Sequence, residues 1–88
     1  IGLGRLAGDT MPPHNGEMHP DGDEVLIMVS GVIDVDLELD AGTETVRLES
    51  GQALVVPQSV WHLIRFVEPG QLVNITPGPR GDYRPLAE

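Results

Sequence analysis

Residues 32–40 alternate between apolar and acidic side chains, and this pattern constrains the fold more than any other feature of the sequence. The apolar positions are Ile33, Val35, Leu37 and Leu39, and the acidic positions between them are Asp34, Asp36, Glu38 and Asp40. A period of two residues is typical of a β-strand with one face buried and the other in water. Ala41-Gly42 then predicts a tight turn, and residues 43–49 predict the returning strand of a hairpin.

Short apolar runs make up most of the remaining chain, and eleven glycines and eight prolines separate them. Further strands are expected at residues 2–7, 24–30, 53–56, 61–67 and 72–76. Turns are expected at Gly31 and at Glu68-Pro69-Gly70, and residues 77–88 are expected to form an extended tail. Because helical periodicity is nearly absent, the pattern predicts one all-β domain over residues 1–88, either a sandwich or a small barrel.

The charge balance excludes several classes of partner. The 88 residues carry five Lys or Arg against fourteen Asp or Glu, a formal net charge of −9. Such a chain lacks the basic patch that binds nucleic acid or an anionic membrane. The absence of cysteine excludes disulfides and thiolate metal sites. No apolar run approaches the ~20 residues that span a bilayer, so a cytoplasmic protein without a membrane partner is expected.

Two expected strands, residues 25–29 and 63–67, are apolar on both faces. One face of each strand can fill the interior of a sandwich or barrel. The other face needs cover that a chain of 88 residues is too short to supply by itself. We therefore expect a homodimer that forms through a sheet face or edge.

The segment from Glu17 to Glu24 holds three side chains that suit a divalent metal ion. In a strand, residues i and i+2 point to the same side, so Glu17 and His19 can face the interior together. Asp21-Gly22 predicts a chain reversal, after which Glu24 can face His19 from the next strand. A buried Glu24 needs a cation or strong hydrogen bonds, because burying an unpaired carboxylate is costly.

A second imidazole, His62, occurs in a later strand. Two histidines and a carboxylate from separate strands suit a mid-series divalent ion, since neutral imidazole and carboxylate both ligate such ions. Four apolar residues share strand faces with these candidate ligands and are expected to line a pocket beneath them: Leu26, Met28, Ile64 and Phe66.

These two segments resemble the paired motifs of the cupin superfamily. The second half of the first motif, G-x5-H-x-H-x(3,4)-E-x6-G, is matched by His19-x4-Glu24-x6-Gly31. The second motif, G-x5-P-x-G-x2-H-x3-N, is matched by Gly51-x5-Pro57-x-Ser59-x2-His62, with Ser59 in place of Gly and Phe66 in place of Asn. The resemblance covers about residues 13–76 and implies a small double-stranded β-helix, or jelly-roll barrel.

The resemblance also implies that His19, Glu24 and His62 ligate a metal ion. Glu17 stands where the motif has its first histidine, and three interpretations stay open. Glu17 completes a set of two His and two carboxylates, or it points away and leaves a two-His, one-carboxylate set, or the substitution abolishes metal binding. The oxygen-rich set favours Mn²⁺ or Fe²⁺, with Zn²⁺, Ni²⁺ and Cu²⁺ as alternatives, and the three-ligand set resembles the facial triad of non-haem iron enzymes.

Cupins include isomerases, oxygenases, lyases, storage proteins and sensors, so the fold does not name a reaction. The first hypothesis is a metal-dependent enzyme on a small organic substrate, of oxygenase, isomerase or lyase type. The alternative is a non-catalytic small-molecule-binding or sensor protein without a required metal. His14, five residues before His19, is a candidate general acid or base at the mouth, and a plain loop histidine is the simpler interpretation.

Overall fold

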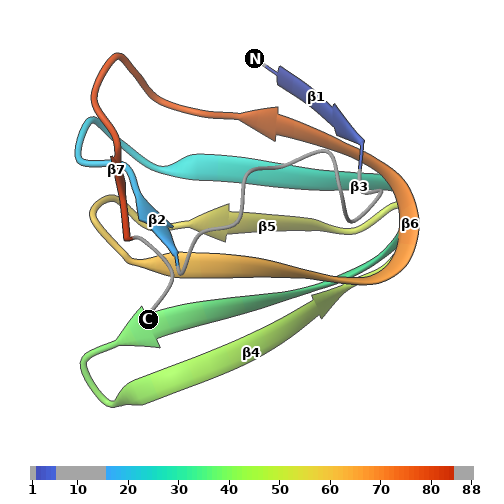
Figure 1. The fold of residues 1–88 in the computed structure, drawn as a ribbon, viewed down its shortest axis with the longest axis horizontal. Coiled ribbons are helices and arrows are strands. Elements are labelled where there is room, and N and C mark those ends of the chain that lie inside the picture. Colours follow the sequence, from blue (N-terminus) through green and yellow to red (C-terminus); the bar gives the residue numbers. More distant parts are fainter. Residues whose placement is uncertain (1, 6–15, 85–88) are drawn as a thin grey trace.

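The computed structural model describes residues 2–5 and 16–84. Figure 1 shows that this part of the chain is built from strands. They are β1 (Gly2–Arg5), β2 (Glu17–Met18), β3 (Glu24–Leu39), β4 (Gly42–Leu48), β5 (Ala53–Val56), β6 (His62–Ile75) and β7 (Asp82–Tyr83). Every strand pair among them is antiparallel, so the all-β prediction is confirmed. The described residues contain no helix with the length and apolarity to cross a membrane.

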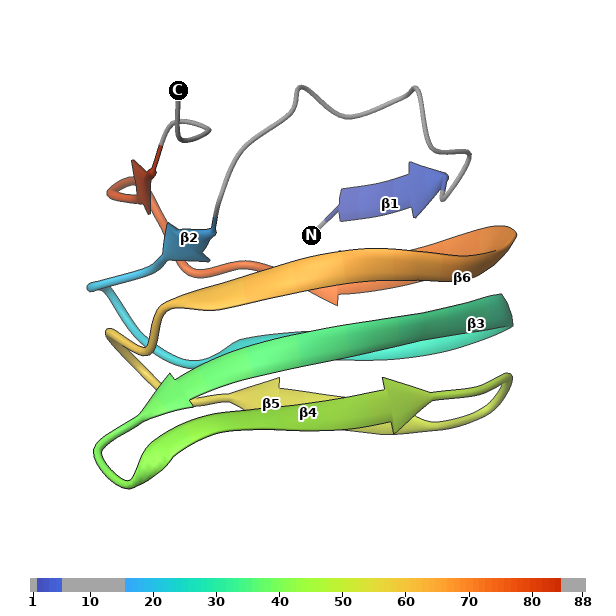
Figure 2. The same ribbon diagram turned by 60° about the horizontal axis from the view of Figure 1, so that its bottom comes forward.

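Two long strands, β3 and β6, run side by side through the whole molecule and bend at the same side of it (Figures 1 and 2). Before its bend, β3 pairs with β5 and with the end of β6. After the bend, it pairs with β4 and with the start of β6. The bend therefore folds one pair of strands into two facing layers, each of which gains its own additional strands.

Glycines allow β3 and β6 to approach closely at the bend. Gly31 has a φ of 81°, and a Cβ built there would lie 2.5 Å from the carbonyl oxygen of Pro69. A Cβ on Gly70 would lie 2.1 Å from the carbonyl oxygen of Ser30. No side chain fits at either position, so the close approach requires glycine in both strands.

The turns expected at Gly31 and at residues 68–70 are therefore bends within continuous strands. The register of β3 against β6 shifts between Met28 and Ile33 but resumes on both sides of the irregularity. Since both strands bend together, ladder pairing continues around the bend, with bulges absorbing the change of direction. A glycine in a sequence does not by itself distinguish such a bend from the end of a strand.

The hydrophobic core lies between the two layers. Its buried apolar side chains are Leu26, Met28, Ile33, Val35, Leu37, Leu48, Val56 and Leu72. The acidic side chains that alternate with the core residues of β3 point outward, as the period of two predicts. On that outer face, Asp34 forms an ion pair with Arg47 at 2.8 Å, and Asp36 forms one with Arg65 at 2.7 Å.

The segment after β6, expected as an extended tail, returns to the open end of the barrel. Its strand β7 pairs with β2, and the backbone N–H of Arg84 donates to the carbonyl of Gly16. Arg80 forms an ion pair with Asp21, and Arg84 pairs with Glu38. These contacts hold residues 76–84 across the end of the molecule where β3 and β6 begin.

Candidate metal centre

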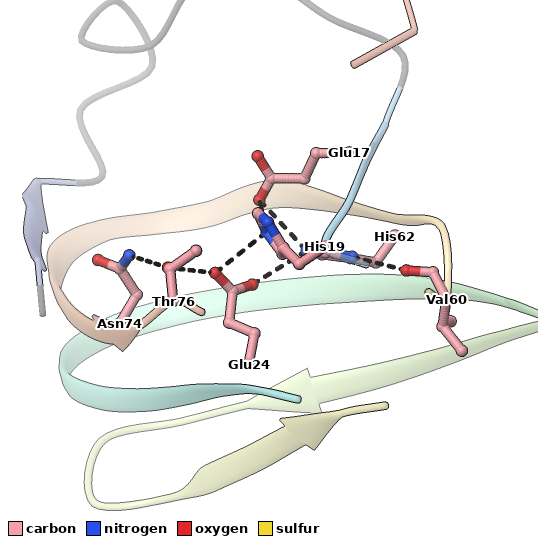
Figure 3. Close-up of polar contacts among 7 residues, drawn as sticks. All are labelled: Glu17, His19, Glu24, Val60, His62, Asn74 and Thr76. Carbon is pink, nitrogen blue, oxygen red and sulfur yellow. Dashed lines mark hydrogen bonds and ion pairs between the residues drawn. The ribbon is translucent and has the colours of Figure 1, made fainter. Parts of the chain in front are cut away.

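Four of the expected site residues lie together at the end of the barrel opposite the bend (Figure 3). Glu17 lies in β2, and His19 follows that strand directly. Glu24 is the first residue of β3, and His62 is the first residue of β6. The pairing of β2 with β6 sets Glu17 opposite His62, so residues 45 positions apart in the sequence become neighbours.

The donor atoms of these four side chains are close enough to share one ion. One atom from each of Glu17, His19, Glu24 and His62 can be chosen so that all four lie within 4.8 Å of one another. His62 Nε2 lies 3.0 Å from Glu24 Oε1 and 3.2 Å from Glu17 Oε1. His19 Nε2 lies 3.3 Å from Glu24 Oε2 and 3.8 Å from Glu17 Oε1.

The cluster is withdrawn from water. The exposed fraction is 3% for Glu24, 1% for His62 and 9% for His19. Burying two carboxylates side by side is unfavourable unless positive charge lies between them. Positive charge is therefore needed at the point where both imidazoles meet both carboxylates.

His62 has a defined orientation within the cluster. Its Nδ1 lies 3.1 Å from the carbonyl oxygen of Val60, and because a carbonyl only accepts, Nδ1 carries a proton and donates it. Burial lowers the pKa of His62, but hydrogen bonds to Glu17 and Glu24 outweigh that effect and raise the pKa to about 9. In the metal-free protein, a proton on Nε2 therefore supplies positive charge between the carboxylates.

His19 contributes a nitrogen that protein groups leave unsatisfied. Its Nε2 is buried and has no hydrogen-bond partner among the described residues, although Glu24 lies 3.3 Å away. A buried polar atom without a partner is uncommon in folded proteins and calls for an explanation such as an ion. The residues present therefore fit a divalent metal, which two imidazoles and two carboxylates would hold with no net charge.

Glu24 is held by two residues that sequence reasoning did not identify. Thr76 Oγ1 donates to Glu24 Oε2 at 2.5 Å, and Asn74 Nδ2 donates to Thr76 Oγ1 at 2.6 Å. Asn74 is the penultimate residue of β6, and Thr76 follows the strand directly, two positions later. The spacing of Asn74 and Thr76 is visible in the sequence. Their contact with Glu24 of β3 is not, because it depends on how the two strands pair.

A pocket of about 320 Å³ opens beside the cluster. His19 forms one wall, and the segment after β6 forms the rest through Thr76, Pro77, Gly78, Pro79, Arg80, Gly81 and Tyr83. None of the four residues expected to line a pocket is among the residues that line this one. Leu26 and Met28 are fully buried in the core, and Ile64 and Phe66 pack against it, because a barrel this small fills its interior with side chains. His14 lies outside the described residues.

Comparison with known proteins identifies the fold. No protein-family model and no curated protein matches the sequence. Among solved structures, hydroxypropylphosphonic acid epoxidase from S. wedmorenis in complex with fosfomycin is similar at 16% identity, over 84% of this chain and 41% of that one, with a TM-score of 0.66. Recombinant oxalate oxidase in complex with glycolate is similar at 17% identity, over 83% and 42%, also with a TM-score of 0.66.

These likenesses, together with the motifs, show that the chain has the cupin fold, as the resemblance of its two segments implied. The chain spans less than half the length of the solved structures it matches. At these identities the similarity shows the fold, and any activity of this chain has to be argued from its own residues.

The stability of the metal-free protein should fall as the pH rises toward 10. The pKa of His62 is about 9 in the folded state against an ordinary value of 6.5, which applies to the unfolded chain. Because the folded value is higher, the stabilisation is fully present below pH 6.5 and disappears as the pH passes through 9. A shift of this size corresponds to roughly 3 kcal/mol of the free energy of unfolding. Urea unfolding in the presence of a chelator, at several pH values, measures the effect.

The imidazole can also be followed directly. The chemical shift of the His62 Cε1 proton reports its protonation, and the midpoint of its titration should lie near 9. A midpoint at 6.5 or below would show that the two carboxylates do not hold a proton on Nε2.

Proposed function

We propose that the chain binds one divalent transition-metal ion through Glu17, His19, Glu24 and His62. The observation that carries this proposal is the buried cluster of two imidazoles and two carboxylates, in which His19 Nε2 has no hydrogen-bond partner among the described residues. A metal ion would satisfy that nitrogen and replace the proton that His62 otherwise holds.

Glu17 belongs to the proposed ligand set because its carboxylate lies within the cluster. Its Oε1 is 3.2 Å from His62 Nε2, and its side chain is only 14% exposed. This position supports the four-ligand interpretation over the one in which Glu17 points away. With two carboxylate oxygens, the ligand set is harder than one built mainly from imidazole. A harder set favours Mn²⁺ or Fe²⁺ and leaves Zn²⁺, Ni²⁺ and Cu²⁺ as alternatives.

We propose further that the protein is a metal-dependent enzyme acting on a small oxygen-bearing organic molecule. A metal at this position would polarise or chelate oxygen atoms of such a ligand. The adjoining pocket, with His19 in its wall, is large enough for a small molecule to approach the site from the side of residues 76–83. The similar solved structures are an epoxidase bound to fosfomycin and an oxalate oxidase bound to glycolate, which supports this ligand class.

A non-catalytic binding protein is the second candidate. Contacts between the segment after β6 and the barrel favour it, because Arg80 pairs with Asp21 and Arg84 lies 4.4 Å from the ring centroid of Trp61. A segment held this firmly would retain a ligand and slow its release. The two candidates differ in whether the metal keeps a coordination position that water or substrate can occupy.

Purified protein without a histidine tag should contain close to one metal ion per chain. His62→Ala should lose it, because that change removes a ligand and leaves both carboxylates without their bridging nitrogen. Glu17→Gln should weaken binding by roughly tenfold or more if Glu17 is a ligand, and by much less if it is not. Plasma mass spectrometry measures the metal content, and a competing chelator measures the affinity.

Asp36→Asn is the matched control for the carboxylate change. Asp36 pairs with Arg65 on the outer face of the barrel, away from the cluster, and its removal should leave the metal content unchanged. Wild-type protein that takes up no Mn²⁺, Fe²⁺ or Zn²⁺ after chelation and reloading would contradict the proposed metal site.

The Mn²⁺-loaded protein should enhance the relaxation of bulk water protons, because an enzyme needs an exchangeable coordination position. Glycolate added to this sample should lower the enhancement by displacing water from the metal. Relaxivity no greater than outer-sphere water alone gives, and unchanged by glycolate, would mean a filled coordination sphere and would favour the non-catalytic binding protein.

We also propose a homodimer in which a second copy covers the outer face formed by β5, the first half of β3 and the end of β6. The register aligns Val55, Val25 and Ile75 across this face. The exposed fraction is 53% for Val55, 47% for Val29 and 42% for Ile75. A chain of net charge −9 repels its own copy, so an uncharged apolar face is where two copies meet at least electrostatic cost.

Light scattering after size exclusion should give twice the 9.5 kDa mass of one chain. Val55→Glu should shift the protein toward monomer, because it introduces a charge into the apolar row. Thr45→Glu, on the charged outer face of β4, should not. A wild-type protein that stays monomeric at high concentration would contradict the dimer.

A further inference from the structure

The carboxylate of Glu24 is engaged on both of its oxygens. Oε1 lies 3.0 Å from His62 Nε2, inside the cluster. Oε2 accepts a hydrogen bond of 2.5 Å from Thr76 Oγ1, which in turn accepts one of 2.6 Å from Asn74 Nδ2 (Figure 3). A line of hydrogen bonds therefore runs from Asn74 through Thr76 to a candidate metal ligand.

The direction of this line follows from counting protons. An ionised carboxylate only accepts, so the single hydroxyl proton of Thr76 must go to Glu24. The Thr76 oxygen is then left to accept, and the side chain of Asn74 must present its NH₂ group to it. Each hydrogen bond of the line therefore has one direction, from Asn74 to Thr76 and from Thr76 to Glu24. The bond that reaches Glu24 is of the short, charge-assisted kind.

The line crosses between two strands. Asn74 lies in β6 opposite Leu26 of β3, and Thr76 comes directly after the last residue of β6. Glu24 is the first residue of β3, where it pairs with Val56 of β5. A long side chain at a strand end has rotamer freedom to lose, and a hydrogen bond from the neighbouring strand restricts it.

We infer that Thr76, supported by Asn74, is a positioning residue that orients the Glu24 carboxylate for metal binding. The inference rests on the proposed metal site. Thr76 touches the ligand rather than the ion, so its effect is on how well the ligand set is preorganised. Removing such a partner of a metal ligand typically lowers metal affinity by about 10–100-fold.

The test compares Thr76→Val with Thr76→Ser. Valine keeps the shape of threonine but has no hydroxyl, whereas serine keeps the hydroxyl. Zn²⁺ affinity, measured against a chromophoric chelator at fixed pH, should fall by roughly 10–100-fold in Thr76→Val and stay within about threefold of wild type in Thr76→Ser. The visible absorption spectrum of the Co²⁺-loaded protein should change in Thr76→Val alone, because it reports the ligand geometry.

Thr45→Val supplies a matched control. Thr45 Oγ1 donates to Asp36 Oδ1 at 2.7 Å, which is the same kind of bond on the outer face of the barrel. This variant should keep both the Zn²⁺ affinity and the Co²⁺ spectrum of wild type. Asn74→Leu should resemble Thr76→Val in direction but have a smaller effect, because the hydroxyl of Thr76 remains and loses only its donor.

The outcomes separate this inference from the metal site on which it rests. Metal binding by wild type with equal Zn²⁺ affinity and an unchanged Co²⁺ spectrum in Thr76→Val would overturn the positioning role and leave the metal site standing. Equal losses in Thr76→Val and Thr76→Ser would also overturn it, since the hydroxyl would then not be the cause. Failure of wild type to bind Zn²⁺ or Co²⁺ would overturn both.

Discussion

The rest of the site depends on one electrostatic constraint, the burial of two carboxylates against each other. Glu24 is almost fully buried, the side chain of Glu17 is only 14% exposed, and both carboxylates approach the same imidazole nitrogen of His62. Such a pair is stable only with positive charge between its members. A proton on His62 supplies that charge in the metal-free protein and raises the pKa to about 9. A divalent ion would supply more charge and would also satisfy the buried Nε2 of His19.

The architecture that assembles this cluster depends on the bend of β3 and β6. Because both strands turn back on themselves at Gly31 and Gly70, their two starting ends come to the same end of the barrel. Glu24 and His62 are those two starting residues. The bend lies at the opposite end of the barrel from the cluster, yet a side chain at either glycine would clash with backbone and disturb the alignment of Glu24 with His62.

The outer faces of the two layers differ in the side chains that they present to water. One outer face carries acidic residues balanced by Arg47 and Arg65, and it suits exposure. The other carries rows of apolar side chains, among them the exposed Val55 and Ile75. At the open end, residues 76–84 form most of the pocket wall and also include Thr76, which donates to Glu24. The same segment therefore borders the pocket and contacts the cluster.

The sequence by itself determined the all-β class, the alternation of β3, the hairpin to β4 and the residues able to ligate a metal, because these follow from local periodicity and motif spacing. Only the tertiary structure decided that strands continue through Gly31 and Gly70, that Leu26 and Met28 are packed core, and that Asn74 and Thr76 reach Glu24. It also decided that Glu17 joins the cluster. The physical reason is that each of these depends on the register between strands far apart in the chain, which no local pattern specifies.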